Sequence, residues 1–151
     1  MVLENLEERL LSRNGVLVDS NVLLDIVTND PVWGDWSAEA LSDCAEYSDL
    51  IINPIIFAEL SVGYSTIESL EAALPLDAYR REQLPWEAAF LAGKCFVAYR
   101  KRGGSKSAPL PDFYIGAHAA ISNLALLTRD ARRYRSYFPR LEVLAPPDAK
   151  P

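Results

Sequence analysis

Four acidic residues occupy positions where this sequence would ordinarily carry apolar or helix-capping side chains. Asp19 and Asp130 each follow a short apolar run. Glu59 lies inside an apolar segment, and Asp112 opens another. Carboxylates that lie within a few ångströms of one another raise each other's pKa unless a cation neutralises them, and hard oxygen ligands select Mg²⁺ or Mn²⁺ over zinc. The four residues therefore predict a shared metal site and metal-assisted chemistry on phosphate.

Asp19 and Asp130 are expected at the ends of two buried strands. Asp19 ends the predicted strand 15–19, and open α/β sheets bind ligands in the crevice at the carboxyl ends of their strands. Asp130 is expected in the first turn of a helix that Thr128 caps. Taken singly, a turn aspartate and an acidic residue that favours the helix dipole explain the two positions equally well.

Glu59 and Asp112 are expected on helices. Asn53 and Pro54 form a helix start, and positions 55, 59 and 62 then share one apolar face, on which an unpaired carboxylate is costly. A salt bridge to an arginine is the structural alternative for Glu59. Taken alone, Asp112 is interpreted as the N-cap of an alanine-rich helix.

The elements that position these residues alternate along the chain. Strands are predicted at 15–19, 50–52, 124–127 and 141–144, with a short edge strand at 74–77. Helices are predicted at 2–12, 21–28, 37–47, 54–62, 67–73, 85–99, 112–121 and near 132. Short apolar strands between helices predict an α/β fold, a three-layer α/β/α sandwich with a mostly parallel central sheet.

The length of 151 residues, half of them hydrophobic, fits one compact domain. We assign residues 1–14 to an amphipathic helical extension, residues 15–145 to the domain and residues 146–151 to a disordered tail. The start of the chain is acidic and does not resemble a signal peptide, and the longest apolar stretch, 86–99, is too short and too charged to cross a bilayer. We therefore expect a cytoplasmic protein without a membrane span.

Several other chemistries are disfavoured. Cys44 and Cys95 belong to no CxxC or Cys/His cluster, so we expect buried free thiols. His118, the only histidine, lies about 240° around the helix from Asp112, so a packed or surface histidine is expected, and a Ser-His-Asp mechanism is excluded. A haloacid-dehalogenase-type phosphatase needs an aspartate where Asn21 stands, and a response-regulator receiver needs an acidic pair before the first helix.

Charge is distributed unevenly along the chain. Residues 1–93 hold 17 acidic and 4 basic side chains, for a net charge of -13, and residues 94–151 hold 4 and 11, for +7. A basic rim beside an acidic metal pocket suits a polyanion whose backbone is bound by basic side chains while the metal holds one phosphate, although a solvated helix face explains the first basic cluster as well. The candidate RNA-binding residues are Arg100, Lys101, Arg102, Lys106, Arg129, Arg132 and Arg133.

The ordered set of acidic motifs in segments 16–25, 53–60, 110–119 and 126–130 resembles that of PIN domains, and more closely that of VapC-type toxins of toxin-antitoxin pairs. The resemblance covers about residues 15–144. It implies a Mg²⁺- or Mn²⁺-dependent endoribonuclease in which a metal-activated water hydrolyses RNA, leaving a 5′-phosphate and a 3′-hydroxyl.

The resemblance also implies a role for each acidic residue. Asp19 and Asp112 are the expected principal metal ligands, Glu59 completes or orients the metal shell, and Asp130 helps to hold water or a second ion. Hydroxyl and amide groups nearby are suited to hydrogen-bond these carboxylates. They belong to Ser20, Asn21 and Thr128.

The partners implied by the resemblance are an RNA substrate, a VapB-like antitoxin whose segment lies in the acidic crevice, and a second copy of the chain in a homodimer. The N-terminal extension departs from the family pattern, and Leu3, Leu6 and Leu10 on one side of it suit packing on the domain or contact with another chain. Two alternatives stay open: a housekeeping PIN ribonuclease in RNA processing or decay, and a PIN-like module that binds RNA or protein without cleaving.

Overall fold

A five-stranded parallel sheet forms the centre of the computed structural model, which describes residues 2–147. The strand order is β3-β2-β1-β4-β5, and every neighbouring pair is parallel. The strands are β1 (Val16–Val18), β2 (Leu50–Ile52), β3 (Arg80–Arg81), β4 (Ala125–Leu127) and β5 (Val143–Leu144).

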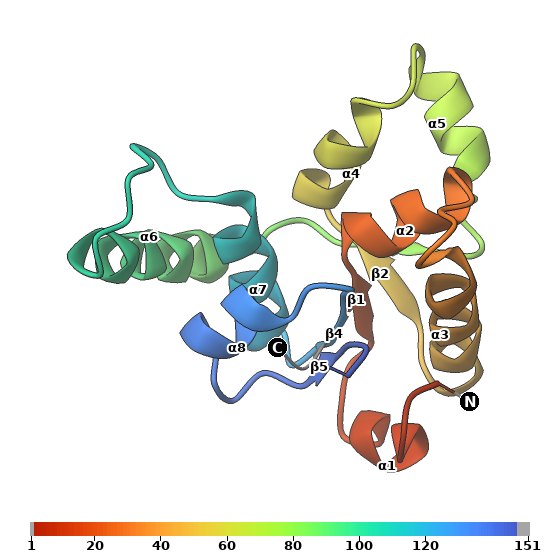
Figure 1. Ribbon diagram of the computed structural model, residues 1–151, viewed down its shortest axis with the longest axis horizontal. Helices are drawn as coiled ribbons and strands as arrows, with labels where there is room; N and C mark the ends of the chain where they lie inside the picture. The colour runs from red at the N-terminus through yellow and green to blue at the C-terminus, as the bar shows by residue number, and fades with distance from the viewer. Residues whose placement is uncertain (1, 148–151) are drawn as a thin grey trace.

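Helices cover both faces of this sheet. Figure 1 shows α2 and α3 on one side and α7 and α8 on the other, with α6 on the outer side of α7. The helices are α1 (Leu6–Leu10), α2 (Ser20–Val27), α3 (Gly34–Tyr47), α4 (Pro54–Ser61), α5 (Ile67–Ala73), α6 (Trp86–Lys101), α7 (Pro111–Ile121) and α8 (Arg132–Tyr137). The predicted three-layer α/β/α architecture is confirmed.

The three central strands are short and apolar because both of their faces are buried. All residues of β1, β2 and β4 are buried, and Val16, Leu17 and Val18 are completely so. A strand with helices on both sides has no solvent face, so it shows a continuous apolar run rather than an alternating pattern. This pattern is what made these strands predictable from the sequence.

The order of the strands reverses between β1 and β4. From β1 the chain moves outward to β2 and β3, and it later returns to the other side of β1 to form β4 and β5. The carboxyl ends of β1 and β4 therefore border a crevice at the topological switch point of the sheet. The backbone N–H of Asp19 donates to the carbonyl of Leu127 at 2.9 Å, so the first residue beyond β1 is held beside the last residue of β4.

The N-terminal extension packs on the domain. Its helix is shorter than predicted, Leu6–Leu10 instead of 2–12. Leu3, Leu6 and Leu10 are each no more than 3% exposed, and α1 contacts α3. Arg9 pairs with Glu142 and also donates to the Val143 carbonyl at 3.1 Å, which ties the extension to the last strand.

The edge strand lies later in the chain than predicted. Residues 74–77 form a turn, closed by hydrogen bonds from the N–H groups of Ala78 and Tyr79 to the Pro75 carbonyl, and the strand is Arg80–Arg81. The prediction was wrong because local apolar pattern cannot show which segment reaches the sheet edge. Within the predicted tail 146–151, Pro146 is buried, and residues 148–151 lie outside the described part of the chain.

Candidate active site

Asp19 lies directly after β1, at the crevice, and is only 4% exposed. It is also the N-cap of α2, because its Oδ1 accepts a hydrogen bond from the Ser20 N–H at 2.8 Å. Its Oδ2 accepts from the hydroxyls of Thr128 at 2.8 Å and Tyr134 at 3.0 Å, and from the Asn21 amide at 3.5 Å. The carboxylate is thus held by donors from three separate elements.

Asp112 faces Asp19 from α7. The helix begins at Pro111 and its N-cap is Leu110, so the predicted capping role of Asp112 is wrong; the residue lies in the first turn. Its Oδ1 accepts from the Tyr134 hydroxyl at 3.2 Å, and its Oδ2 lies 3.4 Å from the Arg133 guanidinium. One tyrosine hydroxyl therefore joins the carboxylates of Asp19 and Asp112.

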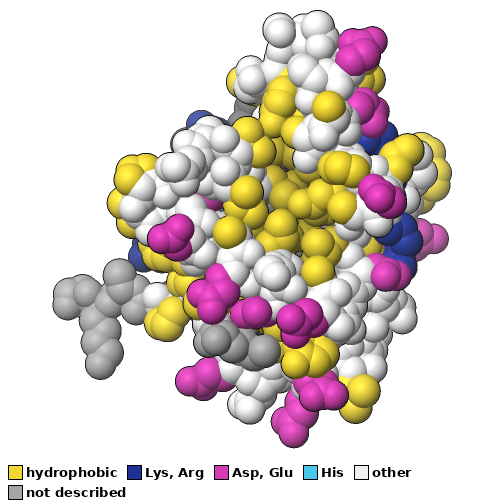
Figure 2. All heavy atoms as spheres, turned by 90° about the vertical axis from the view of Figure 1, so that its right-hand side faces the viewer, with side chains coloured by type: hydrophobic (Ala, Val, Ile, Leu, Met, Phe, Trp, Pro, Cys, Tyr) yellow, Lys and Arg dark blue, Asp and Glu magenta, His cyan; other side chains and the backbone are white. Residues whose placement is uncertain are grey.

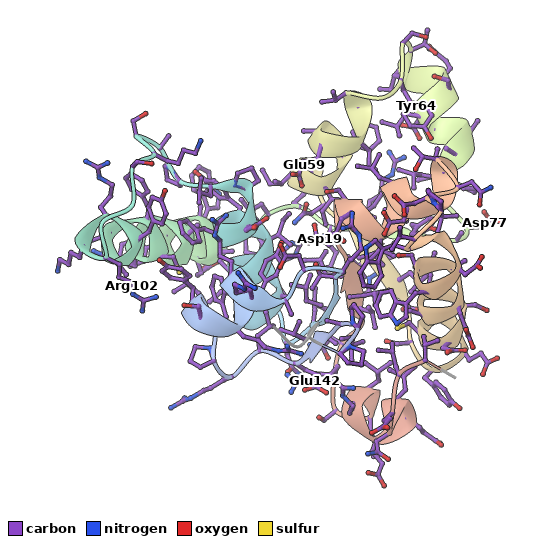
Figure 3. The ribbon with its side chains drawn as sticks, in the orientation of Figure 1. Asp19, Glu59, Tyr64, Asp77, Arg102 and Glu142 are labelled. Carbon is purple, nitrogen blue, oxygen red and sulfur yellow. The ribbon has the colours of Figure 1, made fainter. Side chains whose placement is uncertain are left out.

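Glu59 approaches the same crevice from α4. Asn53 caps this helix by accepting from the Ile56 N–H at 2.9 Å, as predicted. The buried face of α4, however, carries Ile56 and Leu60, and Glu59 is only half-buried. The prediction that Glu59 lies on a buried apolar face is therefore wrong. The carboxylate accepts from the Ser20 hydroxyl at 3.0 Å instead of pairing with an arginine. Figure 3 shows Glu59 and Asp19 near each other in the middle of the molecule, with Asp77 at its right-hand edge.

Asp130 is exposed, and its carboxylate makes no hydrogen bond to the residues that hold the Asp19 carboxylate. It precedes Ala131, the N-cap of α8, so it does not lie in the first turn of the helix, and Thr128 does not cap it. The Thr128 hydroxyl accepts from the Asp130 N–H at 3.2 Å, while the carboxylate accepts from the Arg132 N–H at 3.4 Å. Asp130 does share a cavity of about 580 Å³ with Asp112, and this cavity borders the site.

The three other carboxylates interact electrostatically. The pKa of Asp19 is raised to about 6, mainly by burial; the charges of Asp112 and Glu59 contribute to the rise, and the hydrogen bonds from Thr128 and Tyr134 oppose it. Burial, with a contribution from Asp112, also raises the pKa of Glu59. A site that raises the pKa of two carboxylates in this way favours a cation, which relieves both the repulsion and the loss of solvation. The hard oxygen donors suit Mg²⁺ or Mn²⁺.

Within residues 2–147, no three His, Cys, Asp or Glu side chains converge closely enough to form a preformed metal-binding group. The fit to a divalent cation rests on the oxygen donors of Asp19, Glu59 and Asp112 and on the raised pKa of Asp19 and of Glu59.

Tyr134 is a site residue that the sequence reasoning missed. It is 1% exposed, and burial together with the charges of Asp19 and Asp112 raises its pKa well above the ordinary value. A signal was present in the sequence, because Ala131, Tyr134 and Phe138 follow helical spacing within an arginine-rich segment and all three are buried. Such spacing points Tyr134 inward, toward the end of β4.

A second polar network lies behind Asn21. The buried carboxylate of Asp25 accepts from the Ser37 hydroxyl and from Nε of Arg129, both at 2.8 Å. The Arg129 guanidinium also lies 5.8 Å from the centre of the Trp33 ring, and its backbone N–H donates to Asn21 at 3.1 Å. Arg129, predicted to bind RNA, thus has a structural role in positioning Asn21, and its role in RNA binding stays a prediction.

The other predicted RNA-binding residues divide into two groups. Arg100 donates to the carbonyls of Gly104 and Lys106 and so braces the segment between α6 and α7, whereas Arg102 lies 4.5 Å from the centre of the Tyr137 ring and contacts α8. The remaining basic side chains are exposed, and two of them line the cavity beside Asp112. They are Lys101, Lys106, Arg132 and Arg133, of which the last two line the cavity.

His118 and the cysteines behave as structural residues. His118 is completely buried; the Asn53 amide lies 2.9 Å from its Nδ1, and Glu82 lies 3.3 Å from its Nε2. Since the amide donates, Nε2 carries the proton, and burial lowers the pKa of the ring. Cys44 and Cys95 are buried free thiols, as predicted, and burial raises the pKa of Cys44 to about 12.

Comparison with known proteins assigns the chain to a family. Residues 16–139 match the PIN domain family, and the chain belongs to it. No curated protein sequence matches the chain closely enough to count as a relative.

Solved structures share the fold at low sequence identity. The structure of VapBC2 from Rickettsia felis bound to a DNA fragment from its promoter matches with a TM-score of 0.67 and 19% identity, over 86% of this chain and 97% of that one. VapBC-1 from nontypeable Haemophilus influenzae matches with a TM-score of 0.64 and 19% identity, over 85% of this chain and 95% of that one. A toxin-antitoxin complex from Klebsiella pneumoniae matches with a TM-score of 0.61 and 22% identity, over 89% of this chain and 99% of that one.

The helices of the described chain were also compared with the requirements of a membrane span. None of them combines the length and the apolar character that crossing a bilayer requires.

Proposed function

We propose that this protein is a Mg²⁺- or Mn²⁺-dependent endoribonuclease and the toxin of a VapBC-type toxin-antitoxin pair. The observation that carries the proposal is the buried Asp19 carboxylate, which faces Asp112 and Glu59 at the switch point of the sheet and has a pKa raised to about 6. Membership of the PIN family and the likeness of the fold to VapBC complexes support the same function.

The residues of the chain would divide the work as follows. Asp19 and Asp112 hold the cation, with Glu59 completing its surroundings. The Ser20 N–H and the Thr128 hydroxyl keep the Asp19 carboxylate oriented, since each donates to a different oxygen at 2.8 Å. When bound, the cation would lower the pKa of the attacking water and neutralise charge on the phosphate.

RNA would approach over the cavity beside Asp112. Arg132 and Arg133 line this cavity together with Asp112 and Asp130, so positive charge lies next to the acidic site. Phosphate contacts position a nucleic acid, and guanidinium groups bind phosphate oxygens in pairs. Arg132 and Arg133 therefore suit the backbone of a single RNA strand whose scissile phosphate lies at Asp112.

The antitoxin partner would use an apolar hollow as well as the acidic crevice. Figure 2 shows apolar side chains flooring a hollow, with acidic side chains along its lower rim. A cavity between α2, α4 and α5 is lined by apolar residues that include Ile26, Val27, Leu60 and Leu70. A segment with apolar side chains and flanking basic residues fits such a surface, in keeping with the complexes of similar fold.

Cleavage of total RNA by the partner-free protein tests the enzymatic proposal. With Mg²⁺ or Mn²⁺ we expect discrete fragments that are absent with EDTA and absent for Asp112→Asn. Asp77→Asn, a change of an exposed carboxylate away from the site, serves as the matched control and should cleave normally. Absence of cleavage by a protein that still binds RNA would favour the non-catalytic module.

Two experiments test the toxin role. Expression without the partner should arrest growth, and growth that continues despite metal-dependent cleavage would favour a housekeeping ribonuclease. Val27→Asp should weaken co-purification with the product of the neighbouring gene, because it places a charge on a half-exposed apolar side chain of the hollow. Val97→Asp, at a similarly exposed position on α6, should leave co-purification unchanged.

A further inference from the structure

The Tyr134 hydroxyl lies between the two carboxylates that would hold the cation. It is 3.0 Å from Oδ2 of Asp19 and 3.2 Å from Oδ1 of Asp112. The hydroxyl has one proton and two acidic acceptors, so it can donate to only one of them at a time. The side chain comes from α8 and is buried, so the hydroxyl cannot turn to solvent.

The oxygen of Asp19 nearest to Tyr134 has several donors around it. The hydroxyls of Thr128 and Tyr134 lie 2.8 Å and 3.0 Å from Oδ2 of Asp19, and the Asn21 amide lies 3.5 Å from the same atom. Oδ1 of Asp19 accepts from the Ser20 N–H. A cation held by Asp19 and Asp112 would compete with the Tyr134 hydroxyl, which lies within hydrogen-bond distance of both carboxylates.

Tyr134 also holds the two carboxylates at a fixed separation. Carboxylates that face each other across a poorly solvated space repel, and the charge of Asp112 contributes to the raised pKa of Asp19, of which burial is the main cause. A shared hydroxyl donor reduces this repulsion and sets the separation of the two groups. The same donor competes with a cation for the same oxygens.

We propose that Tyr134 is a positioning residue whose hydroxyl holds Asp19 and Asp112 in register and competes with the cation for their oxygens, so that metal binding would break its hydrogen bond to these carboxylates. The inference rests on the proposed function, because it assumes that Asp19 and Asp112 are metal ligands. In this proposal the cation competes with an internal hydrogen-bond donor for the carboxylate oxygens. The competing donor is one group, the Tyr134 hydroxyl.

The test is Mn²⁺ affinity, measured by titration calorimetry at pH 7.5 for the wild-type protein, Tyr134→Phe and Tyr114→Phe. Loss of the competing charge-assisted hydrogen bond should make Tyr134→Phe bind Mn²⁺ about three- to tenfold more tightly. Tyr114 is a half-buried tyrosine of α7, the helix that carries Asp112, and its hydroxyl takes no part in the bridge, so Tyr114→Phe should match the wild type. Equal or weaker Mn²⁺ binding by Tyr134→Phe would overturn the inference.

A spectroscopic measurement on the wild-type protein keeps the test independent of the stability of the variant. Mn²⁺ should change the near-ultraviolet tyrosine absorption, because the Tyr134 hydroxyl exchanges its acceptor, and Asp19→Asn should show no such change. An unchanged spectrum on saturation would contradict the proposed loss of the Tyr134 hydrogen bond. Mn²⁺ binding by the wild-type protein should be lost in Asp112→Asn. If the wild type shows no such binding, both the proposed function and the inference fail. If the wild type binds Mn²⁺ in this way but Tyr134→Phe does not bind it more tightly, only the inference fails.

Discussion

Asp19→Asn should stabilise the metal-free protein, although it removes a residue that we place at the centre of the active site. The pKa of Asp19 rises from an ordinary value of 3.8 to about 6, mainly because the carboxylate is buried. One pKa unit corresponds to about 1.4 kcal/mol, so the ionised carboxylate destabilises the folded protein by about 3 kcal/mol at pH 8. The variant removes this charge and keeps the shape of the side chain.

The hydrogen bonds around Asp19 can adapt to an amide. The Ser20 N–H still meets an oxygen, and the hydroxyls of Thr128 and Tyr134 can turn to accept from the new NH₂ group. Because neutral hydrogen bonds are weaker than charge-assisted ones, we expect a net gain of about 1–3 kcal/mol in the free energy of unfolding. For a chain of this length, that corresponds to a rise in Tm of roughly 3–10 °C.

The advantage of the variant depends on pH with a defined sign. Between pH 3.8 and about 6 the folded wild-type protein binds more protons at Asp19 than the unfolded chain does, so its free energy of unfolding falls as the pH rises through this range. The variant does not titrate there. The gain in the free energy of unfolding of Asp19→Asn over the wild type is therefore complete above about pH 7 and about half as large near pH 5. It is lost below the pKa that Asp19 has in the unfolded chain.

Urea titrations in EDTA at pH 8 and pH 5 measure this difference, with Asp77→Asn as the control for removal of an exposed charge. Excess Mn²⁺ should stabilise the wild type by about 3 kcal/mol at a hundredfold excess over Kd, and should leave Asp19→Asn unchanged. A variant that is no more stable than the wild type at pH 8, with an unchanged m-value, would refute the argument that burial of this carboxylate destabilises the fold.

Three further changes test the scaffold. Gly116→Ala should cost about 1–3 kcal/mol, because its Cβ would lie 2.3 Å from the Phe138 ring, and an unchanged urea midpoint would show that the ring yields freely. Arg129→Met should lower the free energy of unfolding by about 2–3 kcal/mol, because it leaves the Asp25 carboxylate unpaired. The double variant with Asp25→Asn should recover part of this loss, and equal urea midpoints for the single and the double variant would contradict the prediction. Asn53→Ala should lower Tm by a few degrees, because it removes the N-cap of α4 and so lowers the free energy of unfolding by about 1 kcal/mol. An unchanged Tm would show that this cap does not stabilise the protein.

The parts of the site that the sequence predicted are those that local pattern controls. Asp19 was placed correctly at the end of β1 because three completely buried residues precede it, and α4 was placed correctly because Asn53 and Pro54 begin it. Fold class followed from the same signals, since buried parallel strands show continuous apolar runs. The cap predicted for Asp112 failed because Pro111 itself takes the first helical position.

The parts that failed depend on contacts between distant segments. Glu59 was expected in a buried stripe, but the neighbours of α4 leave Val62 90% exposed and turn the buried face toward Ile56 and Leu60. Arg129 also has a partner that no local pattern indicated, Asp25, 104 residues away in sequence, while its predicted role in RNA binding stays a prediction. Helical spacing shows that two residues share a face, yet it does not show which face the rest of the fold covers.

The sequence by itself determined the chemistry available to this protein: hard oxygen ligands at strand ends and helix starts, a parallel sheet to gather them, and basic residues near the later motifs. Only the tertiary structure decided which of those groups interact. It set Asp19 against Asp112 and Glu59, left Asp130 exposed at the adjoining cavity, and placed the Tyr134 hydroxyl between two carboxylates. The physical reason is that a side chain's acidity and partners depend on burial and on neighbours more than a hundred residues away, which no local pattern specifies.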